Sequence, residues 1–178
     1  LLRGADVPFA FASMVTHLNV ACVTGRDWFD EVWSAGARFG FLIDYVPVGC
    51  EVQGDLVLTG ADRAAKAEAV ERRYEEARPL VMNFPPDEYA SGECQAAGRG
   101  MVHVNADGYV EPCPFSHFAA DNVRDKPLAE ILASEFFSRL RAEVAPLENP
   151  RGQCALTLHA AAVGRIAADC DAICTEKL

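Results

Sequence analysis

The chain has 178 residues, of which 51% are hydrophobic and 24% are charged, so it can supply a core and general disorder is excluded. With 26 acidic and 16 basic residues, the formal net charge is −10. This charge argues against non-specific nucleic-acid binding and against docking on an anionic membrane. No stretch of the sequence approaches the ~20 apolar residues of a membrane span.

The first half of the chain alternates predicted strands and helices. The strands are short apolar runs that suit burial, and the helices carry either an apolar face or a run of Ala, Glu and Arg. The expected order is strand 8–15, helix 28–37, strand 41–48, Gly-rich loop 49–60, helix 63–78 and strand 80–84. Strand–helix alternation at this spacing predicts a parallel sheet with right-handed crossovers.

The pattern changes after residue 86. Asp107-Gly108 separates two short β-prone runs, which predicts a hairpin. Two helices are expected at about 127–144 and 159–176. The sequence therefore predicts an α/β part over residues 1–86 and a smaller α+β part over 87–178.

Seven cysteines make an odd and loosely spaced set. The start of the chain shows no export signal, and a chain of this size needs no disulfide staples, so we predict a reducing, cytoplasmic setting with thiolates available as metal ligands. Cys22 and Cys50 lie in apolar surroundings and are expected to be core or near-core residues. The other five cysteines lie in the second half of the chain.

Three of these cysteines are predicted to lie in loops. Cys113 sits at the exit of the hairpin, Cys94 lies in a loop beside its entry, and Cys154 follows 41 positions after Cys113. A hairpin brings its two ends together, so the thiolates can reach a common point. Such a set is a candidate iron–sulfur or zinc site.

The spacing Cys94-x13-Gly108-x4-Cys113 resembles the opening motif of SPASM and twitch domains, the auxiliary iron–sulfur modules of radical S-adenosylmethionine enzymes. Residues 98–115 read GRGMVHVNADGYVEPCPF, which is similar to the hairpin of that family. Residues 121–137 are similar to the helix that follows it.

The resemblance implies a fold and a cofactor. The fold is the C-terminal portion of a partial (β/α) barrel, followed by a small twitch/SPASM-like domain with a β-hairpin and helices. The cofactor is one auxiliary [4Fe–4S] cluster, held by Cys94, Cys113 and Cys154. The possible fourth ligands are Cys170, Cys174 and His117; the two cysteines lie i, i+4 on the predicted last helix and would share a face.

Two departures from the family pattern shape this interpretation. A full SPASM domain continues with Cys-x2-Cys, but Thr157 stands where that second cysteine belongs, so the shorter twitch pattern with one cluster fits better. The Cys-x3-Cys-x2-Cys motif of the core cluster is absent, and the first residue is Leu1 rather than Met. We therefore expect the C-terminal part of a longer radical enzyme, whose N-terminal half-barrel lies outside this chain.

The same resemblance implies the chemistry of the whole enzyme. It would be an oxidoreductase that cleaves S-adenosylmethionine at the missing core cluster, uses a flavodoxin or ferredoxin as electron donor, and modifies a small-molecule or peptide substrate. Thr16, Asn19 and Tyr45 lie near the carboxyl ends of predicted strands, where barrel active sites are built, and are candidates to contact the nucleoside or the substrate.

A zinc-binding structural or interaction module is the alternative. Its ligands would be Cys94, Cys113, Cys154 and His117, a Cys3His set that suits a closed zinc site. The spacing does not favour it, since zinc ligands usually come in close Cys-x2–4-Cys pairs. His103, Asn105 and Asp107 are expected to serve the structure of the hairpin.

Overall fold

The computed structural model describes residues 2–49, 51–76, 80–85, 94–144 and 154–176. The chain divides into two compact units: unit 1 comprises residues 1–47 and 53–87, and unit 2 comprises residues 48–52 and 88–178. Both helices and sheets are present, so the expected mixed α/β class is confirmed. In the part of the chain that is described, no helix has the length and apolarity that a membrane span requires.

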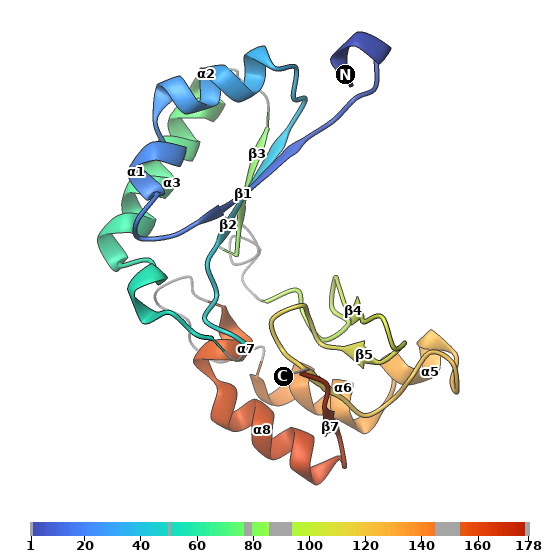
Figure 1. Ribbon diagram of the computed structural model, residues 1–178. Helices are drawn as coiled ribbons and strands as arrows, with labels where there is room; N and C mark the ends of the chain where they lie inside the picture. The colour runs from blue at the N-terminus through green and yellow to red at the C-terminus, as the bar shows by residue number, and fades with distance from the viewer. Residues whose placement is uncertain (1, 50, 77–79, 86–93, 145–153, 177–178) are drawn as a thin grey trace. The chain divides into compact units, whose positions relative to one another are not determined.

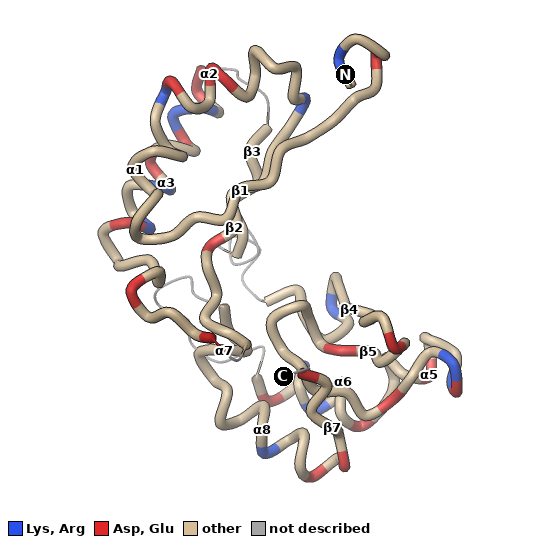
Figure 2. The backbone as a smooth tube through the Cα atoms, viewed as in Figure 1, with Lys and Arg blue, Asp and Glu red and all other residues tan. Residues whose placement is uncertain are grey.

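Unit 1 is built on a parallel sheet with the strand order β1-β2-β3, and the predicted parallel pairing is confirmed. Lys and Arg are interspersed with Asp and Glu along its two longer helices (Figure 2). The elements are η1 (Arg3–Ala5), β1 (Phe11–Val15), α1 (Val20–Val23), α2 (Arg26–Ser34), β2 (Gly40–Asp44), η2 (Gly54–Leu56), α3 (Gly60–Glu75) and β3 (Val81–Phe84).

Only one face of this sheet is covered within the described residues. Helices α1, α2 and α3 all lie on the same side of it (Figure 1). Val15 and Leu42 are fully buried on that face, whereas Met14 and Met82 on the other face are 54% and 43% exposed. The expectation of buried strands is thus correct for one face only, because an apolar run does not reveal which face the helices cover.

Aromatic rings and one buried ion pair fill the space between helices and sheet. Phe29 is fully buried and packs against Phe11 and Trp33. At the carboxyl end of β2, the Lys66 ammonium of α3 pairs with the Asp44 carboxylate. Helix α3 begins with a reciprocal capping box between Thr59 and Asp62, which explains why it starts three residues before the predicted position.

The prediction that Cys22 belongs to the core is wrong. Helix α1 buries Val20 and Val23, which are three positions apart, and this leaves Cys22 exposed. Cys50 lies outside the described residues.

Unit 2 combines two small antiparallel strand pairs with short helices. The predicted hairpin is confirmed as β4 paired with β5, and β6 pairs with β7 near the end of the chain. The elements are β4 (His103–Val104), β5 (Val110–Glu111), β6 (Phe118–Ala119), α5 (Leu128–Leu132), α6 (Glu135–Arg139), the π-helical turn η3 (Leu140–Val144), α7 (Ala155–Leu158), α8 (Ala160–Asp169) and β7 (Ile173–Cys174).

The two long helices predicted for this unit are both interrupted. The first is broken at Ser134, whose hydroxyl accepts a hydrogen bond from the Phe137 amide and starts α6 as a new helix. The second ends at Cys170, because Asp171 adopts a left-handed conformation (φ +53°). There the Ala172 amide donates to the Ala167 carbonyl (2.8 Å), and the two features together form a Schellman C-cap.

The hairpin turn depends on Asn105 and Gly108. The Asn105 side-chain oxygen accepts hydrogen bonds from the amides of Asp107 and Tyr109 (3.0 and 3.1 Å), as an Asx turn does. Gly108 has φ +89°, and a Cβ built on it would lie 2.6 Å from Asn122 Oδ1. The turn therefore needs glycine for both its backbone conformation and its space.

We expect Gly108→Ala to lower the free energy of unfolding by about 1–3 kcal/mol, since a left-handed alanine alone costs about 1–2 kcal/mol and the Asn122 side chain must also move. Thermal unfolding followed by circular dichroism measures this change. Gly164→Ala is the control: nothing lies within 4 Å of a Cβ at that helical position. The control is expected to be neutral or to stabilise by up to about 1 kcal/mol. Equal effects of the two substitutions would contradict the prediction.

Candidate metal centre

Cys94, Cys113 and Cys154 gather in the core of unit 2. Cys94 and Cys113 are buried members of one hydrophobic cluster, and Cys154 packs against that cluster. The Ala97 amide donates to the Pro112 carbonyl (3.0 Å), which ties the segment after Cys94 to the exit strand of the hairpin. The fold thus brings the three loops of the sequence-predicted site together.

Backbone amides approach the sulfurs of two of these cysteines. The Phe115 amide donates to Cys113 Sγ (3.4 Å), within a tight turn closed by the Ser116 amide and the Cys113 carbonyl (3.1 Å). Cys154 is the N-cap residue of α7, and the nearby amides of Leu156 and Thr157 help to lower its pKa, although the side chain makes no regular capping hydrogen bond. Amide donors of this kind stabilise a thiolate and tune iron–sulfur clusters.

The Cys113 and Cys154 thiols are hydrogen-bonded to each other. The pKa of Cys154 is lowered to about 6, first by this hydrogen bond and then by Thr157 and Leu156, which together outweigh the effect of burial. The pKa of Cys113 is raised by the same hydrogen bond, by burial and by the neighbouring sulfurs of Cys154 and Cys94. In the metal-free chain, Cys113 therefore holds the proton and Cys154 is the thiolate.

A single metal ion and an iron–sulfur cluster place different demands on a set of thiolate ligands. Among the described residues, no group of three or more His, Cys, Asp or Glu side chains converges tightly enough to hold one metal ion. A closed zinc site needs four ligands on one ion, whereas in an iron–sulfur cluster each thiolate binds a different iron, so the sulfurs need not converge on one point. The Thr157 hydroxyl is buried beside Cys154, and its interaction with the sulfur helps to lower the pKa of that thiol.

A comparison with family models decides what this part of the chain is similar to. Residues 94–156 match the SPASM iron–sulfur cluster-binding domain. The match begins at Cys94 and ends two residues beyond Cys154, so the expected twitch/SPASM-like auxiliary domain is confirmed over this segment. No curated protein and no solved structure matches the chain.

The three possible fourth ligands of the SPASM-like domain lie in different surroundings. The prediction that Cys170 and Cys174 share one face of a helix is wrong. Helix α8 ends at Cys170, and Cys174 belongs to β7. Burial and the Glu135 carboxylate raise the pKa of Cys170, which disfavours a thiolate there. Cys174 is exposed, and His117 directs Nδ1 toward Glu111 Oε2 (3.7 Å). The fourth ligand stays a prediction.

The structure gives Thr16, Asn19 and Tyr45 of unit 1 local partners. The Asn19 side chain accepts from the Thr16 amide (2.7 Å) and donates to the Met14 carbonyl (3.0 Å), which fixes the chain as it leaves β1. Tyr45 follows β2 and accepts a hydrogen bond on its hydroxyl from the Gln53 amide (3.1 Å). Contacts from these residues to a nucleoside or a substrate stay a prediction.

Sequence reasoning missed Glu111 of the SPASM-like domain. Its side chain is only 1% exposed and accepts hydrogen bonds from His103 (2.7 Å), Asn105 (2.9 Å) and Thr175. Burial acts to raise the pKa of this carboxyl, but the three hydrogen bonds outweigh it and the net pKa is lowered. The predicted hairpin could have indicated this contact, because its register places Glu111 directly opposite His103.

Proposed function

We propose that this chain is the C-terminal part of a radical S-adenosylmethionine oxidoreductase and that unit 2 holds one auxiliary [4Fe–4S] cluster. Cys94, Cys113 and Cys154 would be its ligands. The carrying observation is that the segment matching a cluster-binding domain contains these three cysteines in one core, with amide donors at two of the sulfurs. When bound, such a cluster supplies one-electron redox chemistry or an iron for substrate binding.

Unit 1 supports the barrel half of this proposal. Its parallel sheet carries helices on one face and leaves apolar side chains on the other, as a segment of a barrel wall does. The proposal assigns this unit to the C-terminal part of a partial (β/α) barrel. The N-terminal half-barrel, S-adenosylmethionine, the electron donor and the substrate belong to the proposed whole enzyme, which would work in the cytoplasm.

The chain's own residues have defined tasks at the centre. Burial of Cys94 and Cys113 limits the access of water to the centre. The hydrogen bond from the Phe115 amide would stabilise negative charge on the Cys113 sulfur when a metal is bound. The hydrogen bond from Cys113, with smaller contributions from Thr157 and Leu156, lowers the pKa of Cys154 to about 6, so this ligand needs little proton release when metal binds.

The testing experiment is anaerobic expression followed by quantification of iron, sulfide and zinc. We expect about four irons and four sulfides per chain, with a broad visible absorption that dithionite bleaches. The triple variant Cys94→Ala/Cys113→Ala/Cys154→Ala is expected to lose both metal and colour. Cys22→Ala is the matched control, since Cys22 is exposed in unit 1. One zinc per chain without sulfide would overturn the proposal in favour of a structural zinc module.

A further inference from the structure

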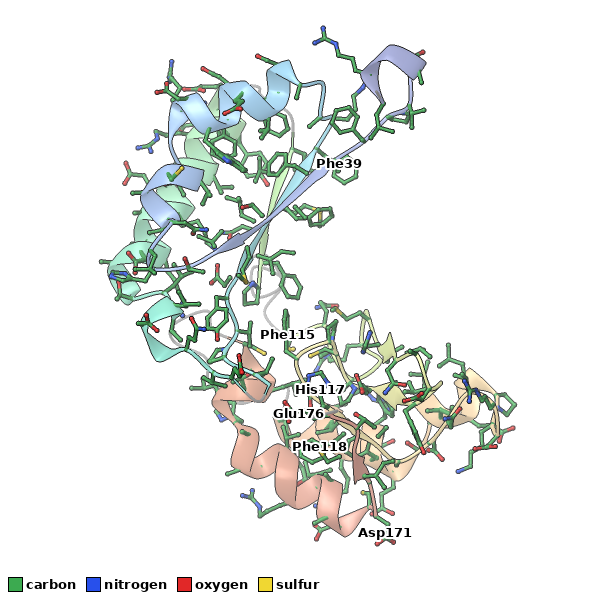
Figure 3. The ribbon with its side chains drawn as sticks, in the orientation of Figure 1. Phe39, Phe115, His117, Phe118, Asp171 and Glu176 are labelled. Carbon is green, nitrogen blue, oxygen red and sulfur yellow. The ribbon has the colours of Figure 1, made fainter. Side chains whose placement is uncertain are left out.

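Unit 2 contains a pocket of about 340 Å³ that the cysteine centre does not use. Its volume lies at the lower end of the range for small-ligand sites. Most of its lining surface is apolar, and the polar side chains that reach it are His103, Asp107, Glu111, His117, Thr175 and Glu176. His117 and Glu176, which come from separate segments, lie near each other in Figure 3.

Glu111 is a buried residue of the pocket lining whose side chain is held in place by three hydrogen bonds. Its carboxylate is almost fully buried, and it is held by the His103 ring (2.7 Å), the Asn105 amide (2.9 Å) and the Thr175 hydroxyl. The His103 ring makes this bond through Nδ1, so its Nε2 atom takes no part in it. The three bonds hold the side chains of His103, Asn105 and Thr175 in place, and the His103 ring takes part only through Nδ1.

Glu176 supplies an acceptor that the protein itself leaves unused. Its Oε1 atom is buried and accepts no hydrogen bond from the part of the chain that the structure describes. A buried carboxylate oxygen without a donor is costly, so such an atom points to a donor that arrives with a ligand. Gly49 leaves room beside it: a Cβ at that position would lie 3.8 Å from this oxygen.

The charges of the wall specify the ligand. Asp107, Glu111 and Glu176 contribute three carboxylates, against two imidazoles from His103 and His117. Among the described residues that line the pocket none is a Lys or Arg, so an anion would meet repulsion from the carboxylates. A group with several N–H donors would instead satisfy Glu176.

We propose that this pocket binds a primary ammonium group, presented either by a lysine side chain of a peptide or by a small free amine. The volume accommodates a side chain of lysine size. None of Cys94, Cys113 and Cys154 lines the pocket, whereas His117, one of the three possible fourth ligands, does.

The experiment is a titration of the full chain, isolated anaerobically, with three probes followed by NMR. Nα-acetyl-lysine N-methylamide represents the peptide source and pentylamine the free amine. The Nε-acetylated lysine derivative keeps the shape but removes the charge. We expect saturable binding of at least one charged probe, shift changes centred on His103, His117 and Glu176, and at least tenfold weaker binding of the acetylated probe. A preference between the two charged probes identifies the source.

Glu176→Gln is expected to weaken binding of the charged probe at least tenfold while keeping the shape of the site. Glu68→Gln is the matched control, because it makes the same charge change on an exposed carboxylate of α3. Unchanged affinity in a folded Glu176→Gln chain would overturn the proposal. If that variant does not fold, the wild-type titration decides: equal binding of the acetylated probe, or shift changes away from the pocket, would also overturn it.

Discussion

Replacing Lys66 by methionine is expected to lower the free energy of unfolding of unit 1 by about 3–5 kcal/mol. The Lys66 side chain is completely buried, and its ammonium pairs with Asp44, whose side chain is 4% exposed. Methionine keeps the length of the side chain but removes the charge, so the Asp44 carboxylate stays buried with Arg63 at 3.7 Å as its remaining cation. An ionised group left in this way costs far more than the pair contributes when intact.

Arg72→Met on the same helix is the matched control. Arg72 pairs with Glu68 at 2.8 Å, but both side chains are more than half exposed, and surface pairs of this kind contribute about 0.2–1 kcal/mol. Trp28 and Trp33 are the two tryptophans of the chain and both lie in unit 1, so their fluorescence during urea unfolding reports on this unit. Similar losses for Lys66→Met and Arg72→Met would contradict the prediction.

A second variant separates charge burial from packing. Asp44→Leu together with Lys66→Met removes both charges and keeps apolar volume, so most of the lost stability should return. If the double variant is no more stable than Lys66→Met alone, the ion pair itself is not the origin of the effect.

The sequence was sufficient for the elements whose signals are local. The strand predicted over 41–48 is present over Gly40–Asp44, and the hairpin predicted at Asp107-Gly108 is present as β4 paired with β5. The breaks at Ser134 and Asp171 were not predictable in the same way. Each depends on a single residue that abandons a helix otherwise favoured by its neighbours, and packing decides between the two states.

The candidate site shows the same division. The proximity of Cys94 to Cys113 follows from hairpin geometry, whereas Cys154, 41 positions beyond Cys113, joins the same core through the packing of α7. The burial of Glu111 was not, because a glutamate in a two-residue strand normally faces solvent. Its position is set by donors from residues 103, 105 and 175, and Thr175 lies 64 positions away, beyond any local pattern.

In the metal-free chain, Cys154 is expected to be alkylated by iodoacetamide with a half-maximal rate near pH 6. The thiolate is the reactive form, and the pKa of Cys154 is lowered to about 6 from the ~8.5 of an ordinary thiol. The reaction should therefore be near its plateau at pH 7 and should decline as the pH falls through 6. Mass spectrometry of the labelled peptide over a pH series measures this midpoint.

The partner residue allows a sharper test of the cause. The hydrogen bond from Cys113 is the largest influence on Cys154, so Cys113→Val, which removes the donor but keeps the volume, is expected to raise the midpoint by about one pH unit or more. Cys113→Ser keeps a hydroxyl donor and should leave the midpoint near 6. If valine and serine give the same midpoint, the low pKa comes from the start of α7 alone, since the amides of Leu156 and Thr157 remain in both variants. Iron–sulfur reconstitution before labelling should then protect Cys154 in the wild type, because a thiolate bound to iron is not available to the reagent.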